Sequence, residues 1–208
     1  MKLFKKEWLR KYFIMGTQNC IKQDPEQILR EAISGGITAF QFREKGKGSL
    51  TGQAKIAMAM KLRDICYNED IPFFINDDVD LIELLQVDGV HIGQDDISAA
   101  KIREKHPNLA IGLSVFNDAE LAVSPLSLID YIGAGPIYQT TSKEDAKQVT
   151  GTKWVESLRS KYPKLPIVGI GGIDTGNAAK VIEAGANGVA VISVITKADN
   201  IEEAVTNI

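Results

Sequence analysis

Two carboxylates follow successive short apolar runs of the sequence. Asp77 comes just after the run at Pro72–Ile75, and Asp96 follows the run at Gly89–Ile92. If these runs are neighbouring parallel strands, which lie ~4.8 Å apart, the strand ends bring the two carboxylates together. Two carboxylates, with water and phosphate oxygens completing an octahedron, form a typical Mg2+ site. We therefore predict that Asp77 and Asp96 bind Mg2+.

These carboxylates have a second interpretation. Acidic residues at the start of a loop often cap helices, so Asp95 or Asp96 could instead cap a helix that begins near Ser98. Metal binding becomes the stronger interpretation if Arg43 and Lys45 lie close by, because a metal ion and cationic side chains together suit a diphosphate.

The apolar run at Ile37–Phe42 leads into the segment Gln41-Phe-Arg43-Glu-Lys45. Side chains alternate along an extended chain, so Gln41, Arg43 and Lys45 are predicted to face one side. The two cations would then line one rim of a site. An ordinary solvated turn after a strand explains these residues equally well when they are considered alone.

A long polar loop follows the run at Asp130–Gly133. It carries three hydroxyls and a lysine, at Thr140, Thr141, Ser142 and Lys143. Long polar loops between short ones often bind ligands, although an ordinary surface loop is the plain alternative.

The last two apolar runs end in residues that suit an anion. Gly169-Ile-Gly171-Gly172 follows one, and Ile192-Ser193 ends the other. Glycines let a backbone approach a ligand closely, and barrels of eight strands often hold a phosphate in the loops after strands seven and eight. A tight turn without a ligand is the alternative. Taken with the metal and cation side, these residues suggest an enzyme that joins two phosphorylated molecules.

Neither histidine completes a catalytic set. His91 lies within an apolar run and is expected to pack inside, and His106 precedes a proline near a predicted helix end. No Ser-His-Asp or Cys-His set is evident, so acyl transfer is not expected.

Short apolar runs alternate with amphipathic segments along the whole chain. Eight runs are predicted as strands: Tyr12–Met15, Ile37–Phe42, Pro72–Ile75, Gly89–Ile92, Ala110–Leu113, Asp130–Gly133, Pro166–Ile170 and Gly188–Ile192. Eight segments are predicted as helices: Pro25–Ser34, Leu50–Glu69, Asp78–Leu85, Ser98–Lys105, Asp118–Ser124, Thr152–Lys161, Thr175–Ala184 and Ile201–Ile208. Unbroken alternation is typical of an α/β fold with a parallel sheet.

Both an open doubly wound sheet and a closed barrel fit this alternation. We favour a single (β/α)8 TIM barrel with parallel strands, because the chain length suits a small barrel. No linker-like stretch interrupts the pattern, so residues 1–208 are predicted to form a single TIM-barrel domain.

The composition limits the partners. The 208 residues include 24 basic and 27 acidic ones, a net charge of -3. This balance argues against a broad grip on nucleic acid or an anionic membrane. The longest segment without a charged residue, 184–196, is too short to cross a bilayer. Charges near the N-terminus argue against a signal peptide.

Cysteine usage agrees with these limits, since Cys20 and Cys66 show no metal or redox spacing and are expected to be reduced thiols. We therefore expect a cytoplasmic enzyme that acts on small-molecule substrates, with no nucleic acid and no membrane partner. The sequence does not decide the oligomeric state, and a homodimer is one of the alternatives.

The order and spacing of these motifs resemble the thiamine-phosphate synthase family over residues 12–196. The most specific segments are Gln41-Phe-Arg-Glu-Lys45, Asn76-Asp77, Asp88-Gly-Val-His-Ile-Gly-Gln-Asp-Asp96, Gly112-Leu-Ser114, Asp130-Tyr-Ile-Gly-Ala-Gly-Pro136, the loop from Thr140 to Ala146, and Gly169-Ile-Gly-Gly172. The resemblance implies a TIM barrel that joins 4-amino-2-methyl-5-(diphosphooxymethyl)pyrimidine to 4-methyl-5-(2-phosphooxyethyl)thiazole, or to its 2-carboxylate. The products would be thiamine phosphate and diphosphate.

The resemblance also implies a role for each matching residue. The contacts to the pyrimidine diphosphate would be Gln41, Arg43, Lys45, Asn76, Ser114 and Lys143, and Arg43, Lys45 and Lys143 among them would be catalytic. The Mg2+ ligands would be Asp77 and Asp96. The contacts to the thiazole phosphate would be Thr140, Thr141, Ser142, Gly172, Ile192 and Ser193.

The sequence departs from the family pattern at three places near this site. Ser142 stands where Thr is usual, Gln139 replaces a frequent Pro, and Phe116 occupies a place often held by His. These departures bear on fine contacts more than on the reaction.

The implied mechanism is a dissociative substitution assisted by Mg2+. It needs no general base, because the attacking thiazole nitrogen carries no proton. Three alternatives stay open: a thiazole tautomerase, another phosphate-binding barrel isomerase, and a non-catalytic sensor of thiamine precursors. A tautomerase has no use for a diphosphate site, an isomerase needs an acid–base pair, and a sensor does not need an intact metal pair.

Overall fold

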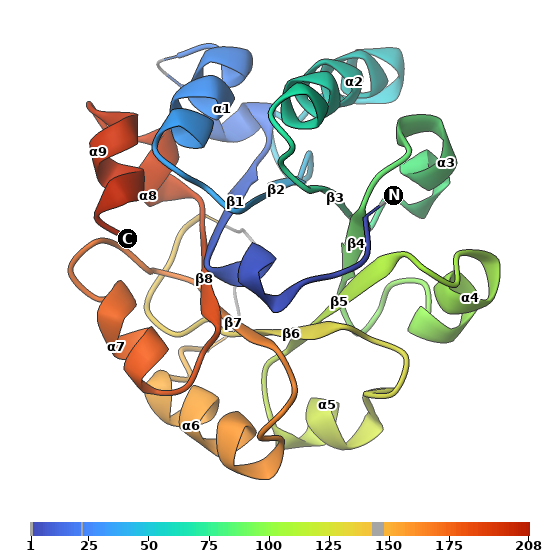
Figure 1. Ribbon diagram of the computed structural model, residues 1–208, viewed down its shortest axis with the longest axis vertical. Coiled ribbons are helices and arrows are strands. Elements are labelled where there is room, and N and C mark those ends of the chain that lie inside the picture. The colour runs from blue at the N-terminus through green and yellow to red at the C-terminus, as the bar shows by residue number, and fades with distance from the viewer. Residues whose placement is uncertain (1, 22, 143–147) are drawn as a thin grey trace.

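Eight parallel strands close into a barrel, with the helices outside it (Figure 1). The structure, a computed structural model, describes residues 2–21, 23–142 and 148–208. The strands are β1 (Lys11–Met15), β2 (Ala39–Phe42), β3 (Phe73–Asn76), β4 (Gly89–Ile92), β5 (Ala110–Val115), β6 (Tyr131–Ala134), β7 (Ile167–Ile170) and β8 (Gly188–Val191).

The pairing of the first and last strands decides between the two predicted architectures. Each strand pairs with the next, and β8 pairs back to β1 through Lys11 and Val189. An open doubly wound sheet would leave β1 and β8 at separate edges. The TIM barrel is therefore confirmed, and the open sheet is excluded.

The predicted helices are confirmed, most with shorter ends. The helices are α1 (Pro25–Ser34), α2 (Gly52–Asn68), α3 (Ile82–Leu85), α4 (Ala99–Lys105), α5 (Asp118–Val123), α6 (Thr152–Lys161), α7 (Ala178–Glu183), α8 (Ser193–Thr196) and α9 (Ile201–Thr206). The single turn of α8 escaped prediction because it continues an apolar stretch directly after β8. Within the described part of the chain, no helix is both long and apolar enough to cross a membrane.

Strand side chains alternate between two buried layers. Tyr12 and Ile14 of β1 belong to a cluster inside the barrel, whereas Phe13 and Met15 pack in the larger core between strands and helices. Because both faces of each strand are buried, the strands appear in the sequence as continuous apolar runs.

The segment before β1 covers the N-terminal end of the barrel, as the dark blue chain in Figure 1 shows. The ring of Phe4 stacks on Tyr131 with centroids 5.7 Å apart, and the ring of Trp8 meets Phe74 edge-on at 6.0 Å. These contacts fill that end with aromatic rings.

A repeated hydrogen bond fastens the strands in pairs at the same end. The residue just before each even-numbered strand accepts a bond from a backbone N–H at the start of the preceding odd-numbered strand. The four acceptors are Thr38, Asp88, Asp130 and Asn187, and the bonds are 2.8–3.1 Å long. Barrels keep their stability at this end and their chemistry at the other.

Candidate functional site

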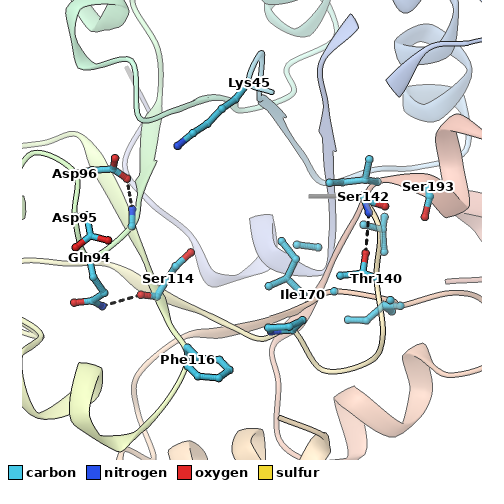
Figure 2. A pocket seen from close by; sticks show the side chains of 18 residues that line it. Lys45, Gln94, Asp95, Asp96, Ser114, Phe116, Thr140, Ser142, Ile170 and Ser193 are labelled. Carbon is cyan, nitrogen blue, oxygen red and sulfur yellow. Dashed lines mark hydrogen bonds between the residues drawn. The ribbon is translucent and has the colours of Figure 1, made fainter. Parts of the chain in front are cut away.

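A cavity of about 250 Å³ opens at the C-terminal ends of the strands. Its lining includes these predicted site residues: Lys45, Asp96, Ser114, Thr140, Ser142, Gly172, Ile192 and Ser193. Figure 2 shows Asp95, Asp96 and Ser114 on one side and Thr140 and Ser142 on the other. The lining comes from the loops of six strands, so closure of the barrel brings these residues together.

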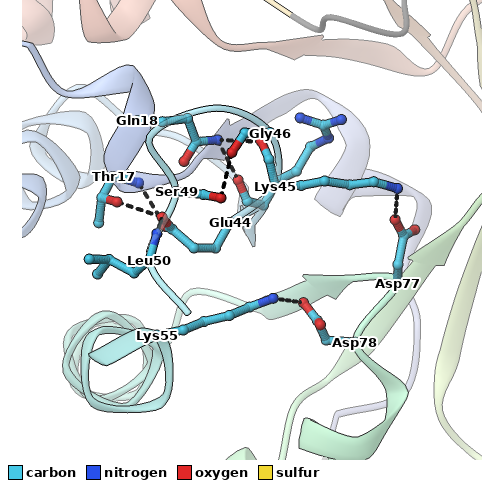
Figure 3. A network of polar contacts seen from close by, with 11 residues as sticks. Thr17, Gln18, Glu44, Lys45, Gly46, Ser49, Leu50, Lys55, Asp77 and Asp78 are labelled. Atoms are coloured by element: carbon cyan, nitrogen blue, oxygen red, sulfur yellow. Dashed lines mark hydrogen bonds and ion pairs between the residues drawn. The ribbon is translucent and has the colours of Figure 1, made fainter. Parts of the chain in front are cut away.

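The carboxylate of Asp77 lies beside two charged groups. Its Oδ2 accepts a hydrogen bond from Nζ of Lys45 at 2.6 Å (Figure 3). Burial raises the pKa of Asp77, the Lys45 ammonium opposes that shift, and the neighbouring carboxyl of Asp96 adds to it. The two carboxylates that the sequence placed at neighbouring strand ends are therefore close in space.

The backbone of Asp77 holds the side chain in this position. Its φ of 61° is uncommon for a residue other than glycine. Its N–H donates to the carbonyl oxygen of His91 on β4 at 3.0 Å. Unusual backbone conformations of this kind gather at functional sites.

The helix-cap interpretation of Asp96 is wrong. Helix α4 is capped by Ser98, whose Oγ accepts a hydrogen bond from the N–H of Lys101. Oδ2 of Asp96 instead accepts a bond from the N–H of Gly93 at 2.6 Å, which holds the carboxylate at the cavity.

The chemistry of this pair fits Mg2+. Among the described residues, no group of three or more His, Cys, Asp or Glu side chains could hold a metal ion. The side chains of Asp77 and Asp96 would supply two oxygen ligands, and water and phosphate would supply the others, an arrangement that Mg2+ prefers. Burial is the main cause of the raised pKa of Asp77, and a divalent cation would offset the Asp96 repulsion that adds to it.

The cations gather beside the cavity in a second pocket of about 350 Å³. Its lining holds Arg43, Lys45, Lys47 and Lys197, and no acidic residue is among the described residues that line it. Arg43 is buried, with 7% of its surface exposed. Lys45, Ser142, Ile192 and Ser193 line both spaces, so the two are adjacent.

Glu44, which the sequence analysis did not single out, anchors the loop that carries these cations. Its carboxylate is buried and accepts hydrogen bonds from the N–H and hydroxyl of Thr17 and from the N–H of Leu50 (Figure 3). The alternation that points Arg43 and Lys45 toward the pockets points Glu44 the other way. The available signal in the sequence was an acidic residue between two cations that are predicted to bind phosphate.

Gln41 and Ser114 are joined through the barrel interior. Gln41 is buried on β2, and its amide bonds to the hydroxyl of Tyr12. The hydroxyls of Tyr12 and Tyr131 bond to each other, and His91 bonds to both Tyr131 and Ser114. His91 therefore packs inside the barrel as predicted. Asn76, the last residue of β3, is also buried.

The predicted phosphate loops meet on the other side of the cavity. Gly172 has a φ of 65°, and a Cβ there would lie 2.4 Å from the carbonyl oxygen of Gln139. Only glycine lets the two loops approach this closely. The N–H of Ser142 bonds to the hydroxyl of Thr140. Thr140 lines the cavity, whereas Thr141 lines the second pocket. Lys143 lies outside the described residues.

Apolar residues complete the cavity wall. Phe116, already noted as a departure from the family pattern, lines it together with Ile170 and Ala190, which sequence reasoning did not identify. The amide of Gln94 also lines it and donates to the carbonyl oxygen of Ser114 at 2.8 Å. Ile170 and Ala190 look like ordinary core residues in the sequence, so only the barrel geometry reveals them.

The chain is similar to known proteins along nearly its whole length. A family described as "Thiamine monophosphate synthase" matches residues 11–195. A "Thiamine-phosphate synthase" of Oceanobacillus iheyensis is 57% identical over 202 residues, covering 97% of this chain and 98% of the relative. A "Thiamine-phosphate synthase 1" of Streptococcus pneumoniae is 43% identical, covering 98% and 97% respectively.

A solved structure is similar in shape as well. The "Thiamine phosphate pyrophosphorylase from Pyrococcus furiosus" superposes with a TM-score of 0.85 at 30% identity, covering 97% of this chain and 94% of that one. Sequence similarity and barrel geometry agree: this chain belongs to the thiamine monophosphate synthase family.

Proposed function

We propose that this chain makes thiamine phosphate by joining a pyrimidine diphosphate to a thiazole phosphate. The observation that carries the proposal is one cavity with two unlike sides. Carboxylates and Lys45 lie on one side, and hydroxyls and a close-packed glycine turn lie on the other. Membership of the family and the names of the close relatives support the same reaction.

We assign the diphosphate end of the pyrimidine substrate to the cation side. Arg43 and Lys45 would bind its phosphate oxygens, with Lys143 as a third catalytic cation on the strength of the family pattern. Asn76 and Ser114 would contact the same substrate, and Gln41 would contact its ring. Arg43 suits this task because a guanidinium binds phosphate oxygens through two parallel hydrogen bonds.

The carboxylates of Asp77 and Asp96 would hold Mg2+, the proposed cofactor. When bound, the ion would neutralise charge on the departing diphosphate. The protein's own part is to hold the Asp77 carboxylate beside Lys45 and Asp96 through its backbone turn, and to hold Asp96 at the cavity through the Gly93–Asp96 hydrogen bond.

The phosphate of the thiazole substrate is assigned to the opposite side. Its contacts would be Thr140, Thr141, Ser142, Gly172, Ile192 and Ser193. At Gly172, Ile192 and Ser193 the backbone N–H groups would donate, because no side-chain cation lies among these residues.

We propose that the C–O bond of the pyrimidine methylene breaks first and that the diphosphate leaves with the electron pair. The thiazole nitrogen then donates its lone pair to the methylene carbon and forms the new C–N bond. No proton moves, so no base is required. Arg43 and Lys45 stabilise the leaving group electrostatically, and the cavity holds both partners in position.

A substrate analogue tests the order of these two steps. Replacing the pyrimidine methyl group by trifluoromethyl withdraws electrons and should slow a single turnover, with ~1.4 kcal/mol of lost stabilisation for each tenfold decrease in rate. A near-normal rate would contradict the dissociative order.

The direct test of the function is to incubate the purified chain with both phosphorylated precursors and Mg2+. We expect thiamine phosphate and diphosphate in equal amounts, and neither when one precursor is omitted. A tautomerase would release no diphosphate, and a sensor would bind a precursor without turnover. Either outcome would overturn the proposal.

The setting of this reaction is also proposed. We infer a single domain over residues 1–208 that works in the cytoplasm on small molecules, with no nucleic acid or membrane partner. The acidic net charge and the free thiols of Cys20 and Cys66 support this setting.

A further inference from the structure

Four hydrogen bonds form a continuous buried chain across the barrel interior. Nε2 of Gln41 donates to Oη of Tyr12 at 2.9 Å, and that oxygen lies 3.0 Å from Oη of Tyr131. Oη of Tyr131 lies 3.1 Å from Nδ1 of His91, whose Nε2 lies 2.9 Å from Oγ of Ser114. The chain connects five strands, and both of its ends are residues assigned to the pyrimidine substrate.

Two inward-facing glycines make room for this chain. A Cβ on Gly112 would lie 2.4 Å from the hydroxyl of Tyr131 and 2.6 Å from Nδ1 of His91. A Cβ on Gly133 would lie 2.9 Å from Cε1 of His91. Any larger residue at either position would displace the groups in the middle of the hydrogen-bond chain. The two glycines therefore leave the space that the hydrogen-bond chain occupies inside the barrel.

The protons of the chain can be assigned by counting. Burial raises the pKa of both phenols, so each keeps its single proton at neutral pH. Tyr12 accepts from Gln41, and its own buried proton is paired within this hydrogen-bond chain only if it is donated to Tyr131. Tyr131 then donates to Nδ1 of His91, which must be unprotonated. A neutral imidazole with its proton on Nε2 donates to Ser114.

This assignment leaves one open group at each end. Oε1 of Gln41 is buried and has no hydrogen-bond partner within the described residues. The hydroxyl of Ser114 accepts from His91, so its own proton can be donated into the cavity that it lines. A buried acceptor without a partner is costly, which points to a ligand donor.

We infer that this hydrogen-bond chain runs in one direction, from the amide of Gln41 to the hydroxyl of Ser114, and that Tyr12, Tyr131 and His91 are positioning residues for the aminopyrimidine. They keep a bare carbonyl oxygen at Gln41 for the amino group and a donor at Ser114 for an acceptor of the same substrate. The inference rests on the proposed function for the identity of that substrate, but the direction of the chain does not.

Nitrogen NMR tests the direction without any substrate. The protein has only two histidines, so every histidine signal of a His106→Gln variant comes from His91. We expect the neutral tautomer with the proton on Nε2. The tautomer with the proton on Nδ1 would reverse the three bonds between Ser114 and Tyr12 and would turn the carbonyl oxygen of Gln41 toward Tyr12. An imidazolium would break the hydrogen-bond chain, so either result overturns the inference. Neither result depends on whether the protein makes thiamine phosphate.

Kinetics test the positioning role. Tyr131→Phe keeps the ring and removes the hydroxyl that connects Tyr12 to His91. We expect the KM for the pyrimidine diphosphate to rise about tenfold, since one hydrogen bond to a buried partner is lost, while the KM for the thiazole phosphate stays unchanged. Tyr12→Phe should have the same selective effect. Tyr67→Phe, the same change at an exposed position, is the matched control and should change neither KM.

An unchanged pyrimidine KM in both variants would overturn the positioning role. Equal increases in both KM values would show a general structural effect and would overturn it as well. If the wild-type protein makes no thiamine phosphate, the proposed function fails. The tautomer of His91 still decides the direction of the hydrogen-bond chain.

Discussion

The ammonium group of Lys45 lies 2.6 Å from Oδ2 of Asp77, although the two residues belong to different strand ends. The hydrogen bond to Asp77 raises the pKa of Lys45, so the lysine keeps its charge. Asp77 thus faces an ammonium and the carboxyl of Asp96 at once. A phosphate and a metal ion bound here would meet charges of both signs already held in position.

The carboxylate pair is expected to be essential for turnover. Asp77→Asn and Asp96→Asn each remove a proposed Mg2+ ligand without changing side-chain volume, so kcat should fall at least ~100-fold at limiting Mg2+ while the fold is kept. Asp78→Asn is the control, because Asp78 pairs with Lys55 outside the cavity. Steady-state rates over a range of Mg2+ concentrations provide the measurement. Normal activity in both variants would contradict the metal assignment.

The raised pKa of Asp77 also predicts how stability depends on pH. A carboxyl with a higher pKa in the folded state stabilises the fold below its unfolded pKa, and that contribution is lost as the pH rises through the folded value. Asp77→Asn removes this titration. The variant should therefore gain stability relative to the wild type as the pH increases from about 4 to 7.

Denaturant unfolding of both proteins at several pH values measures this difference. The comparison cancels the titrating groups whose surroundings the substitution leaves unchanged. A difference that decreases with rising pH would mean that Lys45 dominates the pKa of Asp77.

The barrel and most of one cavity side were predictable because they depend on local patterns. Buried strands form continuous apolar runs, and Asp77 and Asp96 follow two of them at the spacing of one strand–helix unit. The hydrogen-bond chain inside the barrel was not predictable in this way. Tyr12 and Tyr131 look like core residues, and their contact depends on the register of a closed barrel across most of its strands.

The division of the hydroxyl loop was also beyond the sequence. Thr140 and Thr141 are adjacent, yet they line different spaces. Which way each side chain points depends on how the loop after β6 packs on the glycine turn after β7, and no periodic pattern encodes that contact.

The N-terminal hydrogen bonds should affect stability and leave catalysis alone. Oδ1 of Asn187 accepts bonds from the N–H of Ile167 and from Arg159. Asn187→Ala leaves both donors without this partner and should lower the free energy of unfolding by ~1–3 kcal/mol. Asn207→Ala, at an exposed position near the C-terminus, is the control. Chemical denaturation and kcat per folded molecule separate the two effects, and a large loss of kcat would contradict the division between barrel ends.

Gly172 is expected to matter for the thiazole substrate in particular. A Cβ at this position would lie 2.4 Å from the carbonyl oxygen of Gln139 and 2.8 Å from Tyr138, and the φ of 65° adds strain for any other residue. Gly172→Ala should therefore separate the loops after β6 and β7, raise the KM for the thiazole phosphate about tenfold or more, and cost roughly 1–3 kcal/mol of stability. Gly176→Ala, in the same loop but with its nearest neighbour 3.4 Å away, is the matched control. If Gly172→Ala weakened only the pyrimidine diphosphate, the two sides of the cavity would have to exchange their substrates.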